Sequence, residues 1–102
     1  MTDLLEPWIA AEGERQGSLE RELERELPLE HELAGKSMRA LAVRTDKDDV
    51  LFEVVGGGYA VVHLTWSGRR DRNPAFPSTQ LFSSLKAWRD QRMTPDHEQY
   101  SR

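Results

Sequence analysis

The sequence predicts a small α+β protein in which helices flank a three-stranded antiparallel sheet, in the order α-β-β-β-α. Three observations lead to this class. The charged first third repeats leucine at helical spacing, three β-rich segments follow across short turns, and an amphipathic segment comes next. The 102 residues match one domain. We expect an acidic helical arm over residues 1–34, an α+β core over 35–93 and a flexible tail over 94–102.

The N-terminal arm is expected to be helical. Leu19, Leu23 and Leu27 recur every fourth residue and make a narrow apolar stripe on a charged helix. Glycines within the arm weaken the helix. Residues 3–27 therefore form either one helix or two, and in the second case Ser18 is the N-cap of the second helix.

The arm also carries the residues expected to mediate self-association. With 37% hydrophobic and 31% charged residues, a chain of this length has a modest core. The apolar side chains of the arm exceed what such a core covers. We therefore expect at least a homodimer, with or without a swapped arm. Its interface is predicted to bury Leu4, Leu5, Trp8, Ile9, Leu19, Leu23 and Leu27.

Three consecutive segments predict the sheet. Residues 36–44 suit a strand or a helix, whereas 50–55 and 59–66 are rich in β-branched and aromatic residues. The short turns between them favour an antiparallel meander. Residues 36–44 are therefore expected to form a strand. The glycines at 56–58 are expected to supply positive φ angles in a hairpin. A strand follows them, whereas a phosphate-binding loop needs a helix.

Residues 79–93 predict the last helix, with Ser78 or Thr79 as its N-cap. Its apolar side chains share one helical face. That face is expected to pack on the sheet and to meet Trp66 at the end of the third strand. The side chains concerned are Leu81, Phe82, Leu85 and Trp88.

His63 lies in the middle of the third predicted strand, on the face opposite Trp66. One interpretation makes it a general base or a metal ligand. The other makes it a half-buried structural residue, hydrogen-bonded to a cross-strand neighbour or to the arm. The sequence offers no second ligand or nucleophile at a useful spacing, which favours the structural role. His31 and His97 each lie between two acids without metal-binding spacing, so no metal or other cofactor is predicted.

The loop after this strand is the candidate ligand-binding surface, together with His63. Arg69, Arg70 and Arg72 follow Trp66, and arginines beside an aromatic ring clamp phosphates and stack bases in nucleic-acid-binding proteins. The net charge of -4, concentrated in the arm, argues against nucleic acid as the partner.

Composition excludes further classes. The chain has no cysteine, which excludes disulfides, thiolate metal sites and cysteine nucleophiles, and fits a reducing compartment. No apolar run reaches the roughly 20 residues that cross a bilayer. The acidic N-terminus lacks the basic start of a signal peptide. We therefore expect a cytoplasmic protein without membrane contact.

The segments "DDVLFEVVGGGYAVVHLTWSG" and "FPSTQLFSSLKAW" resemble a family of small, uncharacterised bacterial proteins. Its pattern is D-D-V-L-F-E, Y-A-V-V-H-L-T-W and P-S/T…F…S-L, and the resemblance covers residues 35–93. It implies an α+β domain with helices flanking an antiparallel sheet, and it assigns no activity, cofactor or ligand. The triple glycine exceeds the tight turn expected there, and the acidic arm lies outside the matched part.

Three functions remain open at the level of sequence. The first is a self-associating, non-enzymatic interaction or accessory protein. The second is a ligand-binding or catalytic domain that uses His63, Trp66 and the arginine loop. The third is an immunity-like or regulatory protein that binds one specific partner. No catalytic residue is predicted.

Overall fold

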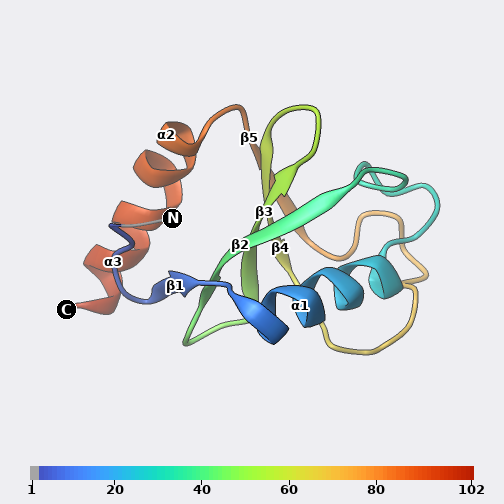
Figure 1. Cartoon of the computed structure of the whole chain (residues 1–102), viewed down its shortest axis with the longest axis horizontal. Helices are drawn as coiled ribbons and strands as arrows, with labels where there is room; N and C mark the ends of the chain where they lie inside the picture. Colours follow the sequence, from blue (N-terminus) through green and yellow to red (C-terminus); the bar gives the residue numbers. More distant parts are fainter. Residues whose placement is uncertain (1–2) are drawn as a thin grey trace.

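The computed structural model describes residues 3–102 (Figure 1). Five strands form one antiparallel sheet, and their order in the sheet is their order in the chain. Helix α1 packs on one face and the C-terminal helices on the other (Figure 1). The α+β class is therefore confirmed. The elements are β1 (Trp8–Ala10), α1 (Gly13–Glu26), β2 (Met38–Arg44), β3 (Asp49–Val54), β4 (Tyr59–His63), β5 (Thr79–Phe82), α2 (Leu85–Trp88), the π-helical η1 (Arg89–Met93) and α3 (Thr94–Tyr100).

The central strands β2, β3 and β4 are the three that the sequence predicts, joined in antiparallel pairs. The turn between β3 and β4 is made by the three glycines, all with positive φ. A side chain in that region of φ is strained, which explains why glycine occupies this turn. The predicted meander is therefore confirmed as the middle of the sheet.

The prediction of three strands is wrong at both edges of the sheet. Residues 8–10, expected to be helical, form β1 and pair with β2. Pro7 and Gly13 leave too short a stretch between them for a stable helix. Residues 79–82, expected to begin the last helix, form β5 and pair with β4. The helix starts later, where Ser84 accepts a hydrogen bond from the amide of Ala87 as N-cap.

The flexible tail expected over residues 94–102 is instead helical as far as Tyr100. Pro95 has no amide hydrogen and cannot continue a regular α-helical ladder. A π-helical turn precedes it, in which the amide of Thr94 bonds to the carbonyl of Arg89. The helix then continues and buries Asp96 against the sheet. Side-chain contacts therefore order this segment.

The arm forms a single helix rather than two, and Ser18 lies inside α1 instead of capping it. Within the chain, α1 already buries Leu19 and Leu23, and Leu27 packs beside them. Trp8 is buried in the opposite core. Of the stripe expected to need a partner, Leu5 remains exposed, while Leu4 and Ile9 are partly buried. The reason for expecting a dimer is thus removed, and the oligomeric state stays a prediction.

A bulge in β2 decides which side chains reach each face. The pairing with β3 shifts by one residue between Ala40 and Ala42, which leaves Leu41 as the extra residue. Ala40 therefore lies in the core under α1, while Ala42 lies in the core under the C-terminal helices. The same shift turns Arg44 toward the C-terminal helices, where it reaches Asp96.

Candidate binding site around Trp66

Trp66 combines an exposed aromatic side chain with an unusual backbone conformation. Its side chain is 48% exposed, whereas Trp8 and Trp88 are buried in the core. Its backbone has a φ of 58°, in the left-handed region that non-glycine residues rarely occupy. Such a conformation costs about 1–3 kcal/mol and persists only where surrounding contacts hold it. The molecule therefore holds a large aromatic side chain at its surface under backbone strain.

Trp66 does not meet the C-terminal helix, so the predicted contact with Phe82 and Trp88 is wrong. Alternation along β4 places Val62 and Leu64 under α1, whereas Val61 faces the C-terminal helices with Phe82 and Trp88. Trp66 lies on the α1 side as well, in a pocket with Leu19 and Val50, so the prediction is wrong in which helix covers this face of the sheet.

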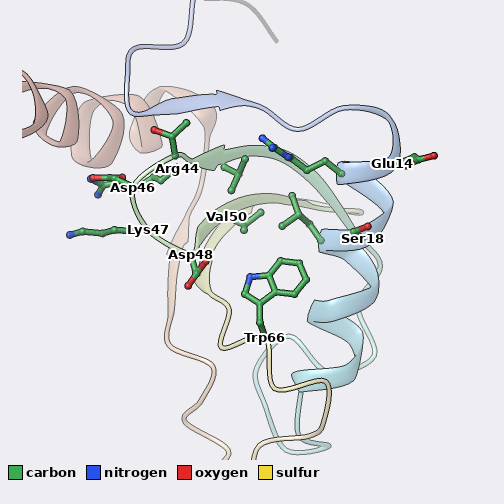
Figure 2. Close-up of a pocket in the computed structure, with 12 residues that line it drawn as sticks. Glu14, Ser18, Arg44, Asp46, Lys47, Asp48, Val50 and Trp66 are labelled. Carbon is green, nitrogen blue, oxygen red and sulfur yellow. The ribbon is translucent and has the colours of Figure 1, made fainter.

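The indole of Trp66 lies in a pocket of about 760 Å³ between the first half of α1 and the turn that joins β2 to β3 (Figure 2). In Figure 2 the ring stands in the middle of the pocket, with Val50 behind it and Ser18 on α1 at its side. The lining residues are Glu14, Arg15, Ser18, Leu19, Val43, Arg44, Thr45, Asp46, Lys47, Asp48, Val50 and Trp66.

The charged residues of the pocket differ in how far they are already neutralised. The guanidinium of Arg44 donates two hydrogen bonds of 2.9 Å to the carboxylate of Asp46. These bonds hold the pKa of Asp46 below its usual value. In Figure 2 Lys47 points away from the indole, whereas Asp48 lies beside it. Within residues 3–102, the carboxylate of Asp48 has no hydrogen bond or ion pair.

The loop that carries Trp66 is anchored to α1 by Glu26, whose side chain is buried. The carboxylate of Glu26 accepts hydrogen bonds from the amide and the hydroxyl of Thr65, both at 2.9 Å. Its other oxygen accepts the amide of Trp66 at 2.8 Å. One of these three bonds goes to the residue with the strained φ, and the other two go to the residue before it. Glu26 is therefore the contact that holds Trp66 in place.

A second buried acid, Glu22, lies one turn earlier on the same face of α1. Its carboxylate accepts the amide of Gly68 at 3.0 Å and shares a side-chain hydrogen bond with Glu26. The bond to Glu26 lowers the pKa of Glu22, and Arg25 adds to that effect. Burial raises the pKa of Glu26, and the bond to Glu22 raises it further. The two neighbouring carboxyl groups therefore shift each other's pKa in opposite directions.

This pair predicts a pH dependence of stability. Because the pKa of Glu26 is raised above 4.5 in the folded chain, its contribution is full below pH 4.5 and is lost as the pH rises through the folded pKa. Glu22 has the opposite sign, and its contribution is lost as the pH falls below 4.5. Glu26→Gln is always neutral. The stability advantage of the wild type over Glu26→Gln is therefore expected to shrink as the pH rises above 4.5. Thermal melts of both proteins across pH test this, and an advantage that grows with pH contradicts it.

His63 lies outside the Trp66 pocket, opposite Asp49 on the neighbouring strand. Its Nδ1 is 2.8 Å from Oδ1 of Asp49, whose Oδ2 is bound by Arg92 at 2.9 Å. The predicted cross-strand hydrogen bond is present, and 53% of the side chain is exposed. The bond runs to the strand and not to the arm.

Replacing His63 with alanine is therefore expected to cost little. An exposed side-chain contact of this kind contributes about 0.5 kcal/mol, and Arg92 continues to neutralise Asp49. We expect the free energy of unfolding to fall by less than about 1 kcal/mol in urea titrations. A larger loss would show that the imidazole stabilises the pairing of β3 with β4 more than its exposure indicates.

The arginine loop does not gather with Trp66 into one surface. Arg69, Arg70 and Arg72 are all exposed, and none of them lines the Trp66 pocket. Arg70 instead lines a second pocket of about 640 Å³, on the side of α1 where Lys36 and Leu29 lie. The expected clamp of arginines around an aromatic ring is thus not formed by these side chains.

The other two histidines, His31 and His97, form hydrogen bonds with backbone groups. Nδ1 of His31 accepts the amide of Leu33, and Nε2 donates to the carbonyl of Pro77. Nδ1 of His97 donates to the carbonyl of Glu6 at 2.7 Å. Among the residues that the structure describes, no group of three His, Cys, Asp or Glu residues has the geometry of a metal site.

Sequence reasoning missed Glu22 and Glu26, although the signal was present. They lie three residues after each of Leu19 and Leu23, which places them on the same helical face as the leucines.

Comparison of the chain with family models, curated proteins and solved structures gives no match. Across residues 3–102, no helix combines the length and apolar character that crossing a membrane requires.

Proposed function

We propose that this chain is a non-enzymatic binding protein that recognises a segment of a protein partner, with Trp66 as the anchor residue. The observation that carries the proposal is the half-exposed indole, held in a strained backbone conformation at the centre of a pocket. Strain of this kind clusters at functional sites. Tryptophan is also enriched among the residues that dominate the energy of protein interfaces.

The lining of the pocket supports a protein partner over a small molecule. Small-molecule sites are enclosed and lined mainly by apolar groups. Here six of the twelve lining residues are charged, and they surround one aromatic ring and a floor that includes Leu19 and Val50. An apolar centre within a charged rim is the usual make-up of a protein interface.

The test is a selection of random peptides displayed on phage, carried out on the wild type and on Trp66→Ala in parallel. We expect peptides that bind the wild type and lose at least about tenfold in affinity on Trp66→Ala, as for an anchor residue. Arg72→Ala is the matched control, because it removes a large exposed side chain of the same loop outside the pocket. Selected peptides that bind all three proteins equally would overturn the proposal.

The variant Trp66→Ala also tests whether self-association uses this pocket. A second copy of this chain is one protein partner that the pocket could take, and a homodimer is also what the sequence predicts. Light scattering of the wild type and Trp66→Ala at micromolar concentration separates the two cases. A dimer that dissociates on Trp66→Ala would identify the partner as a second copy, and a dimer unaffected by it would place self-association on another surface.

A further inference from the structure

We propose that the Trp66 pocket takes a cationic side chain of the partner, an arginine or a lysine. Its charged head stacks on the indole of Trp66 and pairs with the carboxylate of Asp48. The inference rests on the proposed function and adds the chemistry of the group that the pocket selects. A cation over a tryptophan ring, within about 6 Å of its centre, is attracted by the negative face of the π system.

The arrangement of Asp48 and Trp66 supports this choice. Asp48 lies beside the indole in Figure 2, and its carboxylate has no partner within residues 3–102. The backbone of the same residue is held, because its carbonyl accepts the amide of Leu64 at 3.0 Å. Trp66 and the exposed Asp48 therefore line one pocket, and a backbone hydrogen bond anchors Asp48 at its rim.

The same combination occurs, complete with its cation, inside this molecule. On the other face of the sheet, the guanidinium of Arg92 lies 5.9 Å from the ring centre of Trp8. It is held there by the carboxylates of Asp96 at 3.3 Å and Asp49 at 2.9 Å. Among the described residues this is the one cation–π contact. The Trp66 pocket has the ring and the carboxylate but no cation of this chain on the ring.

Three acids and three bases line the pocket, so the choice of a cation depends on which of these charges lie near the ring. Arg44 and Asp46 neutralise each other, and Lys47 points away from the ring. Arg15 is exposed on α1 and makes no cation–π contact with Trp66. The protein as a whole has a net charge of -4, which attracts a basic segment and repels an acidic one.

The test is a titration of nitrogen-labelled protein with the peptide Ac-GGRGG-NH2, followed through the indole N–H signal of Trp66. The citrulline peptide of the same sequence is the neutral, nearly isosteric control. We expect a saturable shift of the Trp66 signal with the arginine peptide, weakened about fivefold with citrulline. The buried indoles of Trp8 and Trp88 are internal references that should not shift.

Two variants assign the contact. Asp48→Asn is expected to weaken binding of the arginine peptide about fivefold and to leave the citrulline peptide unchanged. Glu98→Gln removes the same charge from the exposed surface of α3 and is expected to change neither. Equal weakening by both variants would mean that net charge alone attracts the peptide, which would overturn the proposal.

The outcomes also separate this inference from the proposed function. Selected peptides that depend on Trp66 but lack arginine and lysine would leave the binding function standing and overturn the cationic guest. Failure of the peptides to depend on Trp66 would overturn both.

Discussion

Replacing Asp96 with alanine is expected to lower the free energy of unfolding by about 3–5 kcal/mol. Its Oδ2 accepts the indole N–H of Trp8 at 3.0 Å and lies 3.2 Å from Arg44 and 3.3 Å from Arg92. Both guanidinium groups are largely buried. Alanine removes one carboxylate partner from each of the two buried guanidinium groups. Leaving buried charges partly unpaired costs more free energy than the ion pairs contribute in the folded protein.

The measurement is urea unfolding of the wild type and the variant. Asp96→Asn is expected to fall between them, because the amide oxygen still accepts the bond from Trp8. Glu98→Ala is the matched control on the same helix, and its exposed side chain predicts a change within about 0.5 kcal/mol. Equal stability of Asp96→Ala and Glu98→Ala would mean that the C-terminal residues are the flexible tail that the sequence predicts.

Replacing Glu26 with leucine is expected to lower the free energy of unfolding by about 3 kcal/mol, and the melting temperature by about 15 °C. Three donors of the Trp66 loop lose their acceptor, and Glu22 loses its partner in the shared hydrogen bond. The loop then has no anchor that holds the strained φ of Trp66. We expect Trp66 to leave the pocket and peptide binding to be lost together with stability.

Acrylamide quenching of tryptophan fluorescence reports the second effect. Trp66 is the exposed tryptophan, so Glu26→Leu should increase the quenchable fraction at temperatures where the protein is still folded. Glu24→Leu is the control, since Glu24 is exposed on the same helix. Normal peptide binding by a folded Glu26→Leu protein would show that the loop holds Trp66 without this carboxylate.

Local sequence preferences account for the three central strands and the two helical regions. β-branched and aromatic residues dominate β3 and β4, and the glycine turn between them admits only a hairpin. These preferences are local, and the structure agrees with them. The leucines of α1 likewise identified the helical face that packs on the sheet.

The two edge strands, and which helices cover each face of the sheet, depend on tertiary contacts. β1 and β5 have three and four residues, and their hydrogen bonds come from β2 and β4 rather than from their own preferences. No pattern in the sequence predicts the bulge at Leu41 either. The bulge turns Arg44 toward Asp96, and the ion pair between them helps to hold α3 on the sheet.

The candidate site likewise depends in part on local sequence and in part on tertiary contacts. Tryptophan after a β-rich strand was readable as a candidate, and alternation placed it on the face of Val62 and Leu64, but the sequence did not show that α1 covers that face. Its true position depends on a left-handed φ at Trp66 and on Glu26, which is forty residues away in the chain. A buried carboxyl group can stabilise a strained loop only after folding removes both from water, so neither contribution is visible in local sequence.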